Sequence, residues 1–257
     1  MKVHTLSDWL GLEGQRVVVA GAGGIGGACV AAYVQAGAQV LVTDRDEVRL
    51  EDLARTLSLA ANGGGTLAAD LTASGVARRV VEHAVDVLGG VDVFLHSVGI
   101  NDRRPILEID DADWDSLLAV NLTSAFRLSQ AIGRVMSKQG FGRLVFLSSV
   151  SGLLAHKNHG PYAASKGGLN QMMRVMAAEW AASGITVNAV APGYIETPLT
   201  QKHLSGVGVR ENLVRMIPAG RLGSPEEVTG PVLFLSSRQA SFVTGHVLYV
   251  DGGRTLV

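Results

Sequence analysis

The chain has 257 residues, with 22 basic and 23 acidic side chains and a formal net charge of −1. A charge so close to zero gives no electrostatic reason to expect a nucleic-acid or membrane partner. The single cysteine, Cys29, excludes an internal disulfide, and the sequence has neither a signal-peptide pattern nor an apolar run of roughly 18 residues, so we predict a cytoplasmic protein.

Short apolar segments alternate with longer segments of helical periodicity along the chain. The strand-like segments are 16–20, 39–43, 65–69, 91–95, 143–147, 185–190 and 246–250. The helical segments are 24–36, 47–60, 72–88, 113–138, 161–183 and 224–237. Most of the strand-like segments are continuously apolar, as strands buried on both faces are. This alternation predicts an α/β fold over residues 1–257, a single-domain doubly wound parallel sheet of the Rossmann type.

The segment 198–216 interrupts this rhythm. It follows Pro198, contains Gly206 and Gly208, and mixes polar with apolar residues. Loops after the carboxyl ends of parallel strands line the ligand crevice of such folds. The segment is therefore a candidate substrate lid, and a plain connecting helix is the alternative.

A glycine-rich turn joins the first predicted strand to the first predicted helix. Residues 20–26 read A-G-A-G-G-I-G, in which Gly21, Gly23 and Gly26 form a G-x-G-x-x-G pattern. Such a turn lets a pyrophosphate approach the backbone at a helix N-terminus, where free N–H groups and the helix dipole favour anions. The pattern predicts a dinucleotide site. The alternative is a turn that only packs the helix on the strand.

Acidic residues end the second and third strands. A carboxylate at Asp44 can accept hydrogen bonds from the adenosine ribose and would repel a 2′-phosphate, which favours NAD over NADP. Arg45 follows directly and could contact a phosphate. Asp70 could reach the adenine, or it could be the N-cap of the next helix.

Four polar residues in the second half of the chain suggest catalysis. Tyr162 and Lys166 are four residues apart and share one helix face. A neighbouring ammonium would lower the pKa of the tyrosine, which is near 10 in isolation, toward neutrality. Ser149 can hydrogen-bond a substrate oxygen. Asn121, in a helical segment, can hold a water that links Lys166 to solvent.

In this order, these motifs resemble those of the short-chain dehydrogenase/reductase family from about residue 12 to the C-terminus. Further family-like segments are V-N-A-V-A-P-G-Y-I-E-T over 187–197, G-R-L-G-S-P-E-E-V over 220–228 and T-G-H-V-L-Y-V-D-G-G over 244–253. The resemblance implies a homotetramer that pairs long helices and C-terminal strands. It also implies a set of cofactor contacts, namely Gly21, Gly23, Ile25, Gly26, Asp44, Arg45, Asp70, Leu71, Ser97, Gly99, Tyr162, Lys166, Pro192, Gly193, Ile195 and Thr197.

Two segments depart from the family pattern. The usual glycine loop, T-G-x-x-x-G-x-G, is one residue shorter here, with Ala20 in place of threonine. The usual N-N-A-G after the fourth strand is H-S-V-G at 96–99. We expect Ser97 to make a strand-capping hydrogen bond and His96 to be a packed side chain rather than a catalytic acid.

The substrate side is less defined. The loop 153–161 lies between Ser149 and Tyr162, and its His156 and His159 could contact a polar substrate. We predict no metal site there, because two histidines three apart have no evident third ligand. Asn101, Arg103 and Arg104 follow the fourth strand, where an arginine could pair with a substrate carboxylate. Candidates for an apolar wall are Tyr194, Leu199 and Met216.

These features predict an oxidoreductase that transfers a hydride between NAD(P) and a small alcohol or ketone. Asp44 favours a polyol, sugar or hydroxy-acid dehydrogenase. The alternatives are a 3-oxoacyl-thioester (acyl-carrier-protein) reductase and a non-catalytic NAD-binding regulatory module, which fold alone does not exclude.

Overall fold

The computed structural model describes residues 9–257, so the first eight residues of the predicted domain lie outside the described part. The strands form one parallel sheet in the order β3-β2-β1-β4-β5-β6-β7. Their bounds are β1 Arg16–Ala20, β2 Gln39–Asp44, β3 Gly65–Ala68, β4 Val93–His96, β5 Gly142–Leu147, β6 Ile185–Pro192 and β7 Val247–Val250. The predicted doubly wound Rossmann sheet is confirmed, with small differences at the strand ends.

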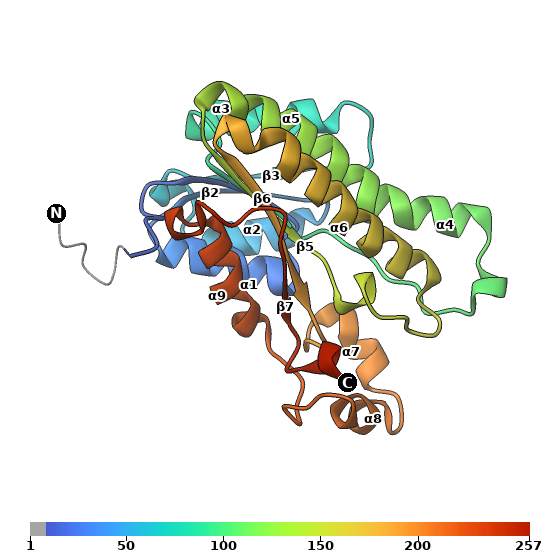
Figure 1. The fold of residues 1–257 in the computed structure, drawn as a ribbon. Helices are drawn as coiled ribbons and strands as arrows, with labels where there is room; N and C mark the ends of the chain where they lie inside the picture. The colour runs from blue at the N-terminus through green and yellow to red at the C-terminus, as the bar shows by residue number, and fades with distance from the viewer. Residues whose placement is uncertain (1–8) are drawn as a thin grey trace.

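Helices cover both faces of this sheet (Figure 1). One face carries α1 (Gly24–Gln35), α2 (Glu47–Thr56) and α9 (Pro225–Ser236). The other carries α3 (Val76–Leu88), α5 (Ser124–Gln139) and α6 (Gly160–Trp180). Two short helices, α7 (Pro198–Leu204) and α8 (Val209–Arg215), lie beyond the carboxyl end of β6. Within residues 9–257, no helix combines the length and the apolar character needed to cross a membrane.

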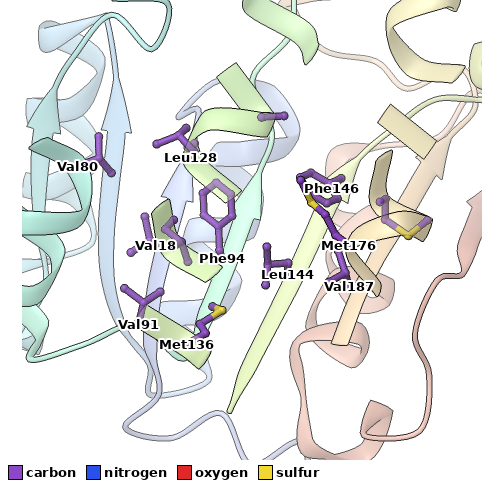
Figure 2. Close-up of a cluster of buried hydrophobic side chains, with 14 of the residues drawn as sticks. Val18, Val80, Val91, Phe94, Leu128, Met136, Leu144, Phe146, Met176 and Val187 are labelled. Atoms are coloured by element: carbon purple, nitrogen blue, oxygen red, sulfur yellow. The ribbon is translucent and has the colours of Figure 1, made fainter. Parts of the chain in front are cut away.

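The core consists of two apolar layers separated by the sheet. Successive residues of a strand point to opposite faces, so Val18 of β1 joins the layer under α3, α5 and α6, whereas Val17 and Val19 join the layer under α1 and α9. Figure 2 shows the first layer, in which Phe94 of β4 and Leu128 of α5 are buried. Burial on both faces explains why the strands are continuously apolar.

The strand order places a crevice at the centre of the sheet. β1 lies between β2 and β4, so the chain moves outward from β1 to β3 and then crosses back to β4 on the other side. The loops that leave β1 and β4 therefore run in opposite directions. In open α/β sheets this switch point is where ligands bind, outside the carboxyl ends of the strands.

Some helical predictions differ from the structure. The segment predicted as one helix over 113–138 contains α4 (Asp111–Leu118), a five-residue π-helical turn at Ala119–Thr123, and then α5. The helix predicted from residue 72 begins only at Val76, after a left-handed Gly75. Asp70 is therefore not its N-cap. Instead, the Asp70 carboxylate accepts hydrogen bonds from the amide and hydroxyl of Thr72, at 2.9 and 2.7 Å. The segment 198–216, a candidate lid with a connecting helix as the alternative, holds two short helices.

Candidate active site

A cavity of about 480 Å³ opens at the switch point, a size typical of small-molecule sites. Fourteen of the sixteen predicted cofactor residues line it: Gly21, Gly23, Ile25, Gly26, Asp44, Arg45, Asp70, Leu71, Ser97, Gly99, Tyr162, Lys166, Pro192 and Thr197. The other two, Gly193 and Ile195, do not line it. Gly193 hydrogen-bonds the Val250 carbonyl of β7, and Ile195 is buried in a β-bridge with Gly223.

The shortened glycine turn still brings the backbone close to the cavity. Gly21 has a φ of +100°, and a Cβ there would lie 2.7 Å from the Ser97 hydroxyl oxygen. A Cβ on Gly26 would clash with the Gly21 carbonyl. Ser97 donates to the carbonyls of Ala20 and Gly21, each at 2.8 Å, and so makes the predicted bond at the end of β1. The N-terminus of α1 carries no side-chain cap, which leaves it suited to a pyrophosphate.

Asp44 and two arginines form the far end of the cavity. The carboxylate of Asp44 accepts hydrogen bonds from the amides of Ala22, at 2.8 Å, and Asp46, at 3.0 Å. Each oxygen retains a lone pair that could accept a ribose hydroxyl. Arg49, in the first turn of α2, lies 3.8 Å from the same carboxylate and lines the cavity beside Arg45. Arg49 was not among the predicted residues; its place in the first turn of the helix that follows Asp44 was the available signal.

The predicted catalytic residues come from the ends of β5 and the start of α6. Ser149 follows β5 and is buried; its hydroxyl oxygen accepts a hydrogen bond from the Ser151 amide at 3.1 Å. Tyr162 and Lys166 lie on α6, and the Lys166 ammonium lies 5.7 Å from the centroid of the Tyr162 ring. It donates to the Leu147 carbonyl at 2.8 Å. Burial lowers the pKa of Lys166 to about 8.

The electrostatics of Tyr162 differ from the prediction. Burial raises the pKa of Tyr162, and hydrogen bonding by Ser149 and the positive charge of Arg103 oppose this only in part. Lys166, which we expected to bring the pKa of Tyr162 toward neutrality, does not outweigh the effect of burial. The phenolate loses hydration on burial, and this cost exceeds the stabilisation by neighbouring groups.

Asn121 connects the loop after β4 to α6. It lies in the π-helical turn and is buried. Its Oδ1 accepts from the Ile100 amide at 2.8 Å, and its Nδ2 donates to the Ile100 carbonyl at 2.9 Å and to the Ser165 hydroxyl at 3.2 Å. The side-chain amide of Asn121, which we expected to hold a water, is therefore hydrogen-bonded to protein groups.

His96 is a core residue. It is fully buried, its Nε2 lies 3.0 Å from the Ser124 hydroxyl, and its ring packs near those of Phe94 and Phe146. Burial lowers the pKa of His96 to about 3, so the ring is neutral at physiological pH. This agrees with the predicted packing role.

Three residues predicted on the substrate side form a chain of ring contacts that starts at Tyr162. The ring centroids of Tyr162 and His159 are 6.1 Å apart, those of His159 and His156 are 5.7 Å apart, and those of His156 and Tyr194 are 6.0 Å apart. Leu199 lines the main cavity. Of the other candidates, Arg104 is engaged by Asp102 and Asp113, and Met216 is 37 % exposed.

A glycine turn beside a carboxylate, with a half-buried tyrosine and a buried lysine in the same cavity, defines the class of nicotinamide-dependent oxidoreductases. The model of the family described as enoyl-(acyl carrier protein) reductase matches residues 19–255. Galactitol 2-dehydrogenase (L-tagatose-forming) of Cereibacter sphaeroides is 38 % identical over 95 % of this chain and 96 % of its own length. A 3-oxoacyl-[acyl-carrier-protein] reductase of Thermotoga maritima is 37 % identical over 94 % of this chain and 98 % of its own.

Solved structures agree with these matches. A gluconate 5-dehydrogenase of Burkholderia cenocepacia, in complex with NADP and tartrate, superimposes with a TM-score of 0.93 at 33 % identity, covering 98 % of this chain and all of its own. The chain belongs to the short-chain dehydrogenase/reductase family. It is an NAD(P)-dependent oxidoreductase that acts on CH–OH groups.

Proposed function

We propose that the protein is an NAD-dependent dehydrogenase of a polyol, sugar or hydroxy acid, in which Tyr162 is the general acid/base. The observation that carries this proposal is that Tyr162 and Lys166 line the same cavity as the glycine turn and Asp44. Galactitol and gluconate dehydrogenases among the relatives support the substrate class.

The cavity fits the proposed cofactor. The glycine turn and the uncapped α1 would bind the pyrophosphate, and Asp44 would bind the adenosine ribose. The lining of the cavity includes Asp44, the glycine turn and Tyr162 with Lys166, the three groups that would meet the adenosine, the pyrophosphate and the nicotinamide of a dinucleotide. Bound NAD would accept the hydride that leaves the carbinol carbon.

Side chains of the protein would carry out the proton transfer. In oxidation, the Tyr162 phenolate oxygen would take the proton of the substrate hydroxyl. The Ser149 hydroxyl would donate a hydrogen bond to the substrate oxygen at the same time. Burial opposes the phenolate, so nearby positive charge at Lys166 and Arg103 is needed to stabilise it. Asn121 would position Ile100 and α6 around Tyr162.

The first test is calorimetric titration of the wild type and Tyr162→Phe with NAD(H) and with NADP(H). We expect both proteins to prefer NAD, because the Asp44 carboxylate would repel a 2′-phosphate. We expect Tyr162→Phe to keep its NAD affinity and to lose turnover by a factor on the order of 10² to 10⁴. If Tyr162→Phe kept full turnover of any substrate, the proposed role would be wrong.

A 3-oxoacyl-thioester reductase is the second candidate. It is favoured by the 37 % identical acyl-carrier-protein reductase and by Arg45 and Arg49, two cations at the adenosine end of the cavity that could hold a 2′-phosphate. A clear preference for NADP would support it. NAD binding without turnover of any alcohol or ketone would instead favour a regulatory module.

We also propose the larger-scale properties implied by the family. The chain would be a single domain that assembles as a cytoplasmic homotetramer. The segment 198–216 would act as a substrate lid, since Pro198 and Leu199 at the start of α7 line the cavity.

A further inference from the structure

Arg103 is a half-buried cation without an acidic partner. Across residues 9–257, no carboxylate forms an ion pair with it. The acid next to it in the chain, Asp102, binds Arg104, which also binds Asp113. A partly desolvated arginine without a counter-ion is unfavourable unless a ligand supplies the anion.

The loop that carries Arg103 is held against the catalytic helix. At one end of the loop, the backbone of Ile100 makes two hydrogen bonds to Asn121. Further along, Ile106 packs on Gly160, where a Cβ would lie 3.1 Å from the Ile106 Cδ1. Gly160 is in the first turn of α6, two residues before Tyr162. The position of Arg103 beside the reacting group is therefore fixed by contacts on both sides.

Arg103 lies within electrostatic range of several aromatic and imidazole rings. Arg103 interacts electrostatically with Tyr162 and Tyr194 and with His156, His159 and His203. Burial lowers the pKa of each of these histidines, so the rings are neutral at pH 7. The other cation near His156 is Arg254, which donates to the Val257 carbonyl oxygen at 2.8 Å. Arg103 and Arg254 thus both bring positive charge to this region, and Arg103 is the one that also acts on Tyr162 and Tyr194.

His156 also has a ring nitrogen without a hydrogen-bond partner in the described structure. Its Nδ1 lies 3.0 Å from the Ser151 hydroxyl, whereas its Nε2 is buried without a hydrogen-bond partner in the described structure. Buried polar atoms are rarely left unpaired. A substrate hydroxyl would satisfy this nitrogen.

We propose that the substrate is a hydroxy carboxylic acid whose carboxylate binds Arg103 while the reacting carbinol lies at Tyr162 and a further hydroxyl contacts His156. This inference rests on the proposed dehydrogenase function. A guanidinium matches a planar carboxylate with two parallel hydrogen bonds.

The test compares matched substrates in matched variants. Hydroxy acids of three to six carbons and the polyols of the same carbon skeleton (glycerate and glycerol, gluconate and glucitol, galactonate and galactitol) are assayed with the wild type, Arg103→Leu and the control Arg78→Leu. Arg78 is 82 % exposed on α3, remote in sequence from the cavity-lining residues of α6. The readout is the ratio of kcat/KM for acid over polyol within each variant, because Arg103→Leu also changes the environment of Tyr162.

We expect the wild type and Arg78→Leu to prefer the acids, and Arg103→Leu to lower that ratio by about 10- to 100-fold, the effect of a hydrogen bond to a charged group. If polyols are the better substrates, or the ratio is unchanged in Arg103→Leu, the inference is wrong and the dehydrogenase function stands. Better turnover of polyol phosphates than of hydroxy acids would also overturn it.

Calorimetric titration of the same acids into NADH-loaded protein separates the two proposals. If no alcohol or ketone is turned over but the acids bind and Arg103→Leu abolishes that binding, the anion site is supported and the dehydrogenase function fails. Absence of both turnover and binding would overturn both.

Discussion

The ammonium of Lys166 is buried, with 3 % of the residue exposed, and it donates to the Leu147 carbonyl. Burial disfavours its charged form and lowers its pKa from 10.5 to about 8. Just below that pH the lysine still carries its charge beside Tyr162, and above it the charge is lost. The residue therefore combines a role in the site with an energetic cost to the fold, as is common where function requires a buried charge.

Lys166 should make stability depend on alkaline pH. Between pH 8 and 10.5 the unfolded chain binds a proton at this lysine that the folded chain does not, so the free energy of unfolding rises with pH in that window. Relative to Lys166→Met, the wild type should gain about 3 kcal/mol from pH 8 to 10.5. Urea denaturation of both proteins at each pH measures the difference, in which other titrating groups cancel. A difference that stays constant across this window would contradict the buried, shifted lysine.

Arg103 and Arg104 show how far a residue's role can be predicted from sequence. Both were candidates to bind a carboxylate, and nothing in the local sequence separates them. The fold does, because it brings Asp113 of α4 to Arg104 and leaves Arg103 without an acid. Contacts between a loop and a distant helix leave no local pattern. Asp44, by contrast, could be predicted because its position at a strand end is itself local.

At the scale of elements, the turn between β1 and α1 is the most constrained part of the site. A methyl group on Gly26 would clash with the Gly21 carbonyl and approach the Ser97 hydroxyl. Relieving this clash requires α1 to move away from β1. The turn therefore couples helix packing to the backbone that faces the cavity.

Gly26→Ala should consequently weaken NAD binding by at least about 10-fold and destabilise the fold by roughly 1–3 kcal/mol, the usual cost of overpacking. Calorimetry and urea denaturation measure the two effects. Gly230→Ala is the matched control, since a Cβ at that position on α9 would meet nothing within 4 Å. Normal NAD affinity in Gly26→Ala would show that the turn tolerates a side chain.

Strand positions were predicted well and helix boundaries less well, for a physical reason. Continuous apolar segments mark strands buried on both faces, whatever the surrounding contacts. The π-helical turn at Ala119–Thr123 keeps a helical pattern, so α4 and α5 appeared as one helix. The late start of α3 depends on the Asp70–Thr72 hydrogen bonds and on Gly75, a turn that a helical pattern in the sequence does not reveal.

At the scale of the whole molecule, the outer layer of helices exposes large apolar side chains. Phe126 on α5 is 44 % exposed and Val175 on α6 is 49 % exposed. Pairing of α5 and α6 with another subunit would remove these side chains from water. These two helices are the long helices expected to pair in the proposed homotetramer.

Sedimentation analysis should therefore detect a tetramer for the wild type, and Phe126→Asp should shift the population toward dimers or monomers because a charge would be buried at the interface. Val48→Asp on α2, where Val48 is 76 % exposed, provides a control that should remain tetrameric. A monomeric wild type would disprove the proposed assembly.

The switch point between β1 and β4 also has a consequence for how new specificities arise. Arg103, His156 and Tyr194 all come from loops beyond the carboxyl ends of the strands, whereas both apolar layers lie along the sheet itself. Exchanging those loops changes what the pocket recognises without disturbing the packing that keeps the chain folded. Grafting the loops 100–109 and 153–160 from a relative with another substrate is thus a practical route to redirect the enzyme while the nucleotide half stays intact.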